Sequence, residues 1–357
     1  MEVRIIMPTK EEAKKALENL IKKSRVHLYK PIQIAEILYR DRITGNINLL
    51  DPDDYRTKSK KWRDDISMVL LGRVCTSSAK FQDNLFDKNA IPPEILNVLG
   101  QENRRTNGAV EAFIYNSFQN KHQQLTNALN YCNNSSKDDF NVKQFIDSFW
   151  KEPGLKRSLD KIYEIIVYGL FATLVDVLNM RVEISLNPEH IRLLEEFEDF
   201  TQKILCIDFK NTTYIQDAKV YRVGVTNAAD RGLDMYSNWG PAIQIKHLTL
   251  DIELAEDIVN SVSSDRIVIV CKDVEKEVII AVLKQIGWAS HIQSVVTEQN
   301  LIDWYEKALR GKYAPITGDK LLDILRNEIA AEFPSTSKLP EVLVNRHYEK
   351  ITDSFWR

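Results

Sequence analysis

The pattern of apolar residues changes near residue 186, and this change constrains the fold more than any other feature of the chain. Up to residue 180, apolar side chains recur at helical spacing, most clearly over 160–180. Beyond it, short stretches rich in β-branched residues are separated by turn residues and helical segments. The elements that this pattern predicts are a strand over 181–186, a helix over 187–205, strands over 219–225, 233–237 and 242–248, a helix over 250–262, a strand over 266–271, a helix over 274–286, a strand over 291–296 and a helix over 298–309.

Three consecutive strands followed by alternating helices and strands are typical of an α/β fold in which helices flank a mixed sheet. The chain has 357 residues, of which 44% are apolar, and this suffices for such a core and for a second lobe. We therefore predict a helical N-terminal lobe over residues 1–185, the α/β core over 186–312 and a C-terminal extension over 313–357.

Composition argues against several classes of protein. No apolar run reaches the roughly 20 residues of a membrane span, and the N-terminus lacks the apolar core of a signal peptide, so we expect a cytoplasmic protein with no membrane partner. The four cysteines are far apart without a CxxC pair, which argues against a zinc knuckle or a disulfide framework. The net charge of −3 gives no global signal for nucleic acid. Walker, G-x-G-x-x-G and G-x-S-x-G motifs are absent, which disfavours nucleotide-binding enzymes and serine hydrolases.

One acidic residue and a polar pair stand out in the central strands. Asp234 lies among apolar neighbours, where an unpartnered carboxylate is costly, so it needs a counter-charge or a metal ion. Ten residues further on, Gln244 and Lys246 alternate along the strand 242–248 and therefore point to the same side. If the two strands are antiparallel neighbours, all three side chains converge at one end of the sheet.

A carboxylate, an amide oxygen and an ammonium group can surround one divalent cation, and Mg²⁺ is the expected ion because it prefers oxygen ligands. In this hypothesis Asp234 bridges the metal, while the amide oxygen of Gln244 and the backbone carbonyl of Ile245 complete the protein ligands. Lys246 orients and polarises the attacking water.

A second acid is expected on the helix predicted just before these strands. Glu198 shares a helix face with Leu194 and Thr201, which makes it our first choice, and Glu195 is the second. The alternative for either glutamate is a charged face in contact with solvent.

Here the residues carry a resemblance to a known family. A helix with Phe197-Glu198, a strand with Gly232-Leu233-Asp234 and a strand with Gln244-Ile245-Lys246 resemble the PD-(D/E)xK nuclease superfamily, in the variant with glutamine in place of the usual acid. With segments 25–36 and 108–115 included, the chain resembles the HaeII-like type II restriction endonucleases. The resemblance implies a Mg²⁺-dependent homodimer that cuts double-stranded DNA at a short palindrome, with GCGC at its centre as the fitting candidate. It also implies in-line attack by water that leaves a 5′-phosphate, and pairing with a DNA methyltransferase.

Two departures from the superfamily pattern concern the metal site. No proline precedes Asp234, although one is common there. Gln244 removes one negative charge, which should weaken metal binding relative to an acid at that position.

Two polar stretches of the N-terminal lobe are candidates for contacts with DNA. Flexible cationic side chains suit phosphates, and we assign this role to Lys58, Lys60, Lys61 and Arg63. Arginine and asparagine suit base edges in the major groove, and we assign this role to Asn103, Arg104, Arg105 and Asn107. For the first stretch, which is neutral over 51–65, the alternative is a solvated helix start.

Two other functions stay open at this point. A structure-directed or repair nuclease of the same fold would cut junctions, flaps or damaged duplex without a palindromic site. A non-catalytic DNA-binding protein would use Asp234 and Lys246 only as a buried ion pair. Dependence on Mg²⁺ distinguishes a nuclease from a non-catalytic DNA-binding protein, because an ion pair needs no metal.

Overall fold

The computed structural model describes residues 7–74, 84–223, 233–284 and 291–356. Gly232 and the last residues of the predicted strand 219–225 and helix 274–286 lie outside these ranges. Within them, no helix has both the length and the apolar character needed to cross a membrane.

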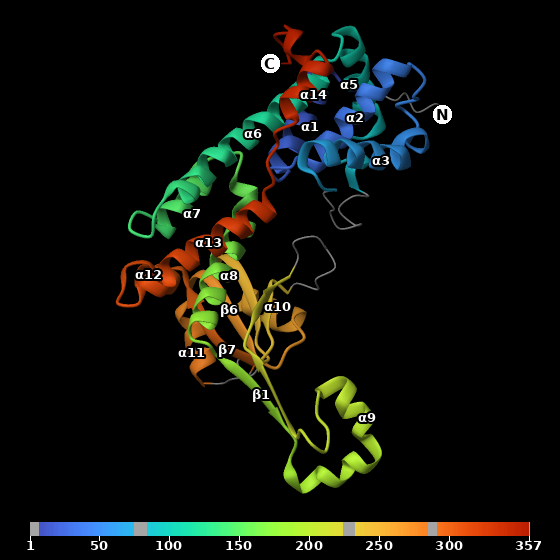
Figure 1. The fold of residues 1–357 in the computed structure, drawn as a ribbon. Helices are drawn as coiled ribbons and strands as arrows, with labels where there is room; N and C mark the ends of the chain where they lie inside the picture. Colours follow the sequence, from blue (N-terminus) through green and yellow to red (C-terminus); the bar gives the residue numbers. More distant parts are fainter. Residues whose placement is uncertain (1–6, 75–83, 224–232, 285–290, 357) are drawn as a thin grey trace.

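The first part of the chain is helical, as predicted (Figure 1). Its elements are α1 (Lys10–Lys23), α2 (Tyr29–Thr44), α3 (Pro52–Leu71), η1 (Asn84–Phe86), α5 (Pro93–Arg105), α6 (Ala109–Asn134), α7 (Val142–Lys151) and η2 (Lys156–Ser158). Thr9 and Glu12 cap the start of α1 reciprocally, and Asp51 caps α3. The C-terminal elements α14 (Leu339–Asn345) and η5 (Tyr348–Lys350) pack into the same apolar core as α1, α2, α3 and α5. Both ends of the chain therefore build the helical lobe.

The helix α6 connects this lobe to the rest of the molecule. Its first half buries Ile114 and Phe118 in the core of the lobe. Its second half buries Leu125 and Leu129 in a different core, which includes one face of the main sheet. The two cores therefore share one continuous helix of 26 residues.

The main sheet is mixed, as predicted, with the strand order β3-β4-β5-β6-β7. Its strands are β3 (Val220–Arg222), β4 (Met235–Ser237), β5 (Ala242–Leu250), β6 (Ile267–Val274) and β7 (Ile292–Thr297). The first three strands pair antiparallel, and β5, β6 and β7 pair in parallel. Crossover helices connect the strands of the parallel part, as is usual for parallel strands.

Helices cover both faces of this sheet. On one face, α8 (Leu159–Val177) and α12 (Glu298–Arg310) pack on the strands, in a core that includes Ile243, Ile245 and Val270, and α13 (Ala314–Glu332) packs on these two helices. On the other face, α10 (Ile252–Ser261) and α11 (Lys276–Lys284) pack on Ile269 and Cys271. Each strand of the parallel part buries residues on both faces, which explains its nearly continuous apolar sequence.

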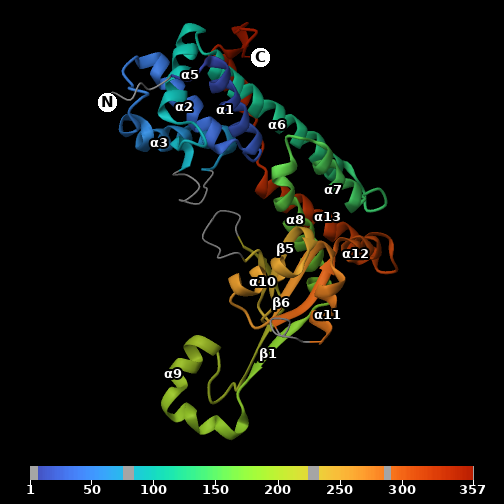
Figure 2. The ribbon, with the colours of Figure 1, turned by 180° about the vertical axis from the view of Figure 1, so that it is seen from behind.

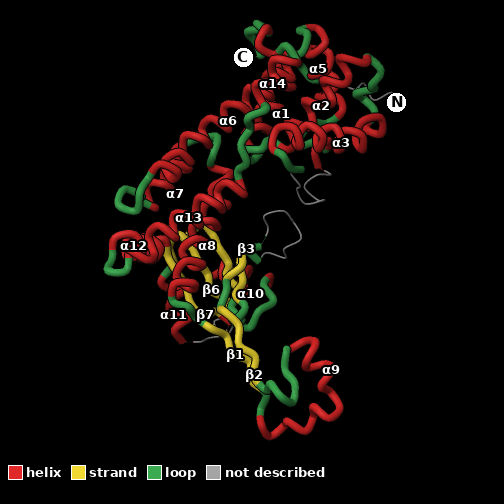
Figure 3. The backbone as a smooth tube through the Cα atoms, in the orientation of Figure 1, coloured by secondary structure: helices red, strands yellow, loops and turns green. Residues whose placement is uncertain are grey.

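The helix predicted over 187–205 lies in an unexpected place. It is present as the turn η3 (Pro188–Leu193) and the helix α9 (Leu194–Leu205), but neither packs on the main sheet. They lie at the far end of a two-stranded antiparallel sheet formed by β1 (Arg181–Ser185) and β2 (Thr213–Asp217) (Figure 3). We call residues 181–217 the arm. The helix that precedes the meander and packs on the sheet is α8.

The predicted boundaries at residues 185 and 312 stay predictions. The packing favours an α/β unit that begins earlier and ends later, because α8 and α13 share the core of the main sheet and contact each other.

Candidate active site

Asp234 lies immediately before β4 and is joined to β5 by two hydrogen bonds. The amide Nε2 of Gln244 donates to its Oδ2 at 2.7 Å, and the backbone N–H of Ile245 donates to the same oxygen at 2.7 Å. The antiparallel register of Met235 with Ile243 brings these groups together. The structure thus brings Asp234 and Gln244 into contact, as the sequence predicted.

The side chain of Gln244 is 2% exposed, and its amide oxygen is one of several buried side-chain atoms that have no hydrogen-bond partner among the described residues. The amide nitrogen is engaged by Asp234, but no described residue donates a hydrogen bond to the buried Oε1. An unpaired buried acceptor costs about 1–3 kcal/mol. This oxygen is therefore available to a cation or to water, which are the partners that a metal site would supply.

Lys246 follows on β5 and is partly buried. Its positive charge acts to lower the pKa of Asp234, and that of Asp160 on α8, so its ammonium group lies within electrostatic reach of both. Within the described residues, Lys246 acts on Asp234 as a neighbouring charge and not as a hydrogen-bonded partner. This arrangement does not favour the view of Asp234 and Lys246 as a closed structural ion pair.

The pKa of Asp234 is raised, and burial is the largest cause. The hydrogen bond from Ile245 and the charges of Lys246 and Lys161 oppose this shift, while the negative charge of Asp160 adds to it. A divalent cation would stabilise the carboxylate in the same way as these positive charges do.

A second acid approaches Asp234 from α8. Glu164 is 6% exposed, and burial raises its pKa to about 7. Lys161 donates to both carboxylate oxygens at 2.9 and 2.7 Å and opposes the shift, whereas the negative charge of Asp234 adds to it. Arg222 on β3 lies 3.8 Å from Glu164 and also favours its charged form. Asp234, Gln244, Lys246 and Glu164 are called the sheet cluster below.

Sequence analysis missed Glu164, although a signal was present. It is the single acid within the apolar stretch 162–175 of α8, and a charged residue in such a stretch is rarely buried without a partner. Asp160, one turn earlier on the same helix, pairs with the Nδ1 atom of His247 on β5. The start of α8 is thus linked to β5 through Asp160 and His247, and the charge of Lys246 acts on both Asp160 and Asp234.

The glutamates predicted on the earlier helix lie elsewhere. Glu198 is on α9, and its Oε1 accepts a hydrogen bond from the backbone N–H of Phe209 at 3.1 Å, within the arm. Glu195 is exposed on the same helix. Figures 1 and 2 both show α9 beyond the far end of β1, away from β5. The structure does not bring either glutamate to Asp234.

The cations predicted to contact phosphates lie on α3. Arg63 is 3% exposed, donates to Gln33 at 2.9 Å and to Asp64 at 2.7 Å, and stacks over the ring of Tyr29. A contact with DNA would require breaking these bonds. Lys58 is paired with Asp54 at 3.0 Å, Lys60 is partly buried and Lys61 is exposed. Their contacts with phosphate stay predictions.

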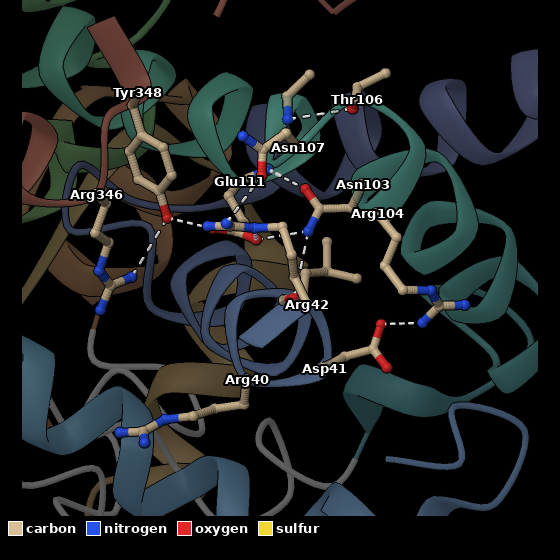
Figure 4. Close-up of polar contacts among 12 residues, drawn as sticks. Arg40, Asp41, Arg42, Asn103, Arg104, Thr106, Asn107, Glu111, Arg346 and Tyr348 are labelled. Atoms are coloured by element: carbon tan, nitrogen blue, oxygen red, sulfur yellow. Dashed lines mark hydrogen bonds and ion pairs between the residues drawn. The ribbon is translucent and has the colours of Figure 1, made fainter. Parts of the chain in front are cut away.

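Of the residues predicted to contact bases, Asn103 belongs to a buried polar network in the lobe, and Figure 4 shows Arg104 and Asn107 near it. Asn103 is fully buried and donates to Glu111 at 2.5 Å. Glu111 also accepts two hydrogen bonds at 2.9 Å from Arg42 and one at 2.5 Å from Tyr348. We call Arg42, Asn103, Glu111 and Tyr348 the lobe network. It gives Asn103 a structural role that occupies its side chain.

The other three members of that stretch lie nearer to the surface. Arg104 pairs with Asp41, and Arg105 pairs with Glu102 at 2.8 Å. Asn107 accepts a weak hydrogen bond from Arg42 at 3.4 Å and has a left-handed backbone, with φ of 53°. Contacts of these residues with bases stay predictions.

The described part of the chain holds no group of three or more histidine, cysteine, aspartate or glutamate side chains arranged to bind a metal ion. The donor set of the sheet cluster is of another kind: the carboxylate of Asp234, the unpaired amide oxygen of Gln244 and the nearby carboxylate of Glu164. Oxygen donors of this mixture suit Mg²⁺, which is bound through one or two carboxylates and retains several waters.

Comparison with known proteins gives a consistent result. The model of the HaeII restriction endonuclease family matches residues 13–348. The chain is 57% identical over 343 residues to the type II restriction enzyme HaeII of Haemophilus aegyptius, a match that covers 96% of this chain and 97% of the relative. It is 56% identical over 342 residues to the type II restriction enzyme NgoBI of Neisseria gonorrhoeae, covering 95% and 97% of the two chains. No solved structure matches it.

Proposed function

The chain belongs to the HaeII restriction endonuclease family, and we propose that it is a type II restriction endonuclease that hydrolyses double-stranded DNA at a short palindrome in the presence of Mg²⁺. The observation that carries this proposal is the sheet cluster. It combines the partly buried carboxylate of Asp234, just before β4, with two groups on β5: the amide oxygen of Gln244, which has no partner among the described residues, and Lys246, whose charge acts on Asp234 without a hydrogen bond between them.

In this proposal Asp234, the Oε1 atom of Gln244 and Glu164 hold the cation. Bound there, Mg²⁺ would supply positive charge to the scissile phosphate and would acidify a coordinated water. The hydrogen bonds from Gln244 and Ile245 to Oδ2 already orient the carboxylate of Asp234, so its Oδ1 has a defined direction. Whether the carbonyl of Ile245 is a further ligand stays a prediction.

Lys246 orients the attacking water and stabilises the negative charge that develops during attack on phosphorus. Its partly buried position strengthens that interaction relative to one in bulk solvent. In-line displacement leaves a 5′-phosphate and a 3′-hydroxyl.

Glu164 takes the role that the sequence assigned to Glu198. A pKa of about 7 means that Glu164 is partly protonated at neutral pH when no cation is present. A cation beside it favours the carboxylate, as Lys161 and Arg222 already do. Its position on α8, which packs on β3 and β5, is fixed by the core of the sheet.

The wider assignment follows from the family. Its relatives are named type II restriction enzymes, and by analogy we propose a homodimer that acts in the cytoplasm, with a DNA methyltransferase that protects the same sites. A GCGC-centred palindrome is the candidate recognition sequence.

The proposal is tested by incubating unmethylated plasmid and phage DNA with the protein in Mg²⁺ and sequencing the fragment ends. An EDTA control, the Lys246→Ala variant and a matched variant at an exposed lysine, Lys312→Ala, complete the set. Discrete bands that need Mg²⁺, persist in Lys312→Ala and are lost in Lys246→Ala support the proposal. Nicking or smearing without fixed ends would favour a structure-directed nuclease instead. Intact DNA with several metals would overturn the catalytic interpretation.

A further inference from the structure

The arm carries several large apolar side chains that the described residues leave exposed. Six of its large apolar side chains are between 44% and 65% exposed: Leu193, Phe197, Phe200, Ile204, Phe209 and Ile215. They come from the turn η3, from α9, from the loop after it and from β2. We call these six residues the arm surface.

The arm has little core of its own. Its buried residues are Leu194, Thr201 and Ile207. Its two strands pair with each other, from Arg181 with Asp217 to Ser185 with Thr213, and with no further strand among the described residues. A single two-stranded ribbon is marginally stable in water, so an arm of this construction needs a further surface to pack against.

The area of the arm surface is of the size that a protein interface needs. An aromatic or large aliphatic side chain has about 200 Å² to bury, so six of them at about half exposure offer on the order of 600 Å² of apolar area. A standard interface buries about 800 Å² on each partner, including a polar rim. The exposed charges of α9, such as Asp199 and Lys203, can provide that rim.

The charge of the arm argues against DNA as the molecule that covers it. Residues 181–217 contain eight acidic residues and four lysines or arginines. A surface that binds phosphates needs an excess of positive charge, and this one has the opposite sign. The occupant is therefore a protein surface with apolar character.

We propose that the arm is the dimerisation element and that the arm surface packs against a second copy of this chain. This inference rests on the proposed function, because an enzyme that cuts both strands of a palindrome needs two catalytic sites related by a two-fold axis, and the described chain holds one sheet cluster. An isologous interface lets the same apolar patch cover itself, with no other partner required. The arm projects away from the rest of the chain, so two copies can meet there without obstruction (Figure 1).

The test is the mass of the full chain in solution, measured by light scattering or sedimentation over a range of concentrations. We expect the parent protein to have twice the 41.3 kDa mass of one chain. Ile204→Asp places a charge on the arm surface at a side chain that is 65% exposed, and we expect it to raise the dissociation constant at least 100-fold. Ile316→Asp makes the same change on α13 at a side chain that is 58% exposed and should leave the dimer intact.

A second variant keeps the test valid if Ile204→Asp disturbs the arm. Replacing residues 186–212 by Asn-Gly joins Ser185 to Thr213 through a tight hairpin turn and removes α9 altogether. We expect this protein to be a folded monomer with the circular dichroism of the remaining elements. A parent protein that stays monomeric at all concentrations, or a shortened variant that still dimerises, would overturn the proposal.

Failure of this inference and failure of the proposed function give different results. Lys246→Ala should lose cleavage and remain a dimer, while Ile204→Asp should become monomeric and lose double-strand cleavage at low concentration. A dimer that depends on the arm but cuts no DNA would leave the inference standing and refute the nuclease. A protein that cuts DNA and dimerises without the arm would refute this inference and leave the proposed function standing.

Discussion

The lobe network and the sheet cluster are both buried groups of charged and polar side chains, but their polar atoms are satisfied to different degrees. In the lobe network, both oxygens of Glu111 accept two hydrogen bonds each, from Arg42, Asn103 and Tyr348. In the sheet cluster, the Oε1 atom of Gln244 has no partner among the described residues, and Glu164 has a pKa of about 7. A complete network holds the fold together, and we propose that the incomplete one receives a cation.

The largest expected effect is on cleavage, from the Lys246→Ala variant. Because Lys246 stabilises charge that develops only during the reaction, its loss should lower the cleavage rate on the order of 1,000-fold. Its ammonium group is engaged in no closed ion pair with Asp234, so the thermal midpoint should change little. Rates and melting curves are measured on the same preparation. A large fall in stability would instead indicate that Lys246 has a structural role, like the residues of the lobe network.

The next effect is on stability, from Glu111→Gln in the lobe network. Removing the negative charge leaves Arg42 without its buried partner, and the free energy of unfolding should fall by about 3 kcal/mol. Urea denaturation measures this change. As a control, Glu341→Gln breaks a pair with Lys338 whose side chains are 61% and 63% exposed, and it should leave the urea midpoint unchanged. Equal effects of the two variants would contradict the distinction drawn here.

Glu164 gives the stability of the metal-free protein a specific dependence on pH. Its folded pKa of about 7 exceeds the usual value of 4.5, so the folded state binds the proton more tightly. Stability should therefore fall as pH rises from about 4.5 to 7, by up to about 3 kcal/mol from this group. Comparing urea midpoints of the parent and Glu164→Gln across this range isolates the contribution. A difference between the two proteins that is independent of pH would refute the raised pKa.

The smallest expected effect comes from Glu198→Gln. This side chain accepts one backbone hydrogen bond at 3.1 Å within the arm and lies away from Asp234. Cleavage at saturating protein should change less than about two-fold, since an exposed hydrogen bond contributes little. Loss of activity comparable to that of Glu164→Gln would restore Glu198 as the second acid.

Much of the α/β core could be predicted because its signals are local. Short β-branched stretches and helical periodicity predicted β5, β6, β7 and the helices between them, and the strand alternation predicted that Gln244 would face Asp234. The arm could not be predicted in this way. The apolar stripe of α9 has the same periodicity as that of a core helix, and only the tertiary structure shows that most of its apolar side chains are exposed in the single chain.

Other differences arise from contacts between distant parts of the chain. Asn103 and Arg104 have the composition of a DNA-reading loop, but their partners lie on α2 and α6, and the network is completed by Tyr348, which is 237 residues from Glu111. Glu164 was missed because its apolar neighbours give the helix α8 the pattern of an ordinary core helix. Sequence periodicity reports which face of a helix is buried but not what that face meets.

The central claim is that Asp234, Gln244 and Glu164 form one cation site, and titration of Mn²⁺ into the full chain by calorimetry tests it most directly. We predict that Asp234→Asn abolishes binding, that Glu164→Gln weakens it at least ten-fold, and that Glu198→Gln leaves it unchanged. Binding that survives in Glu164→Gln and is lost in Glu198→Gln would contradict the assignment of α8 as the acid-bearing helix of the site.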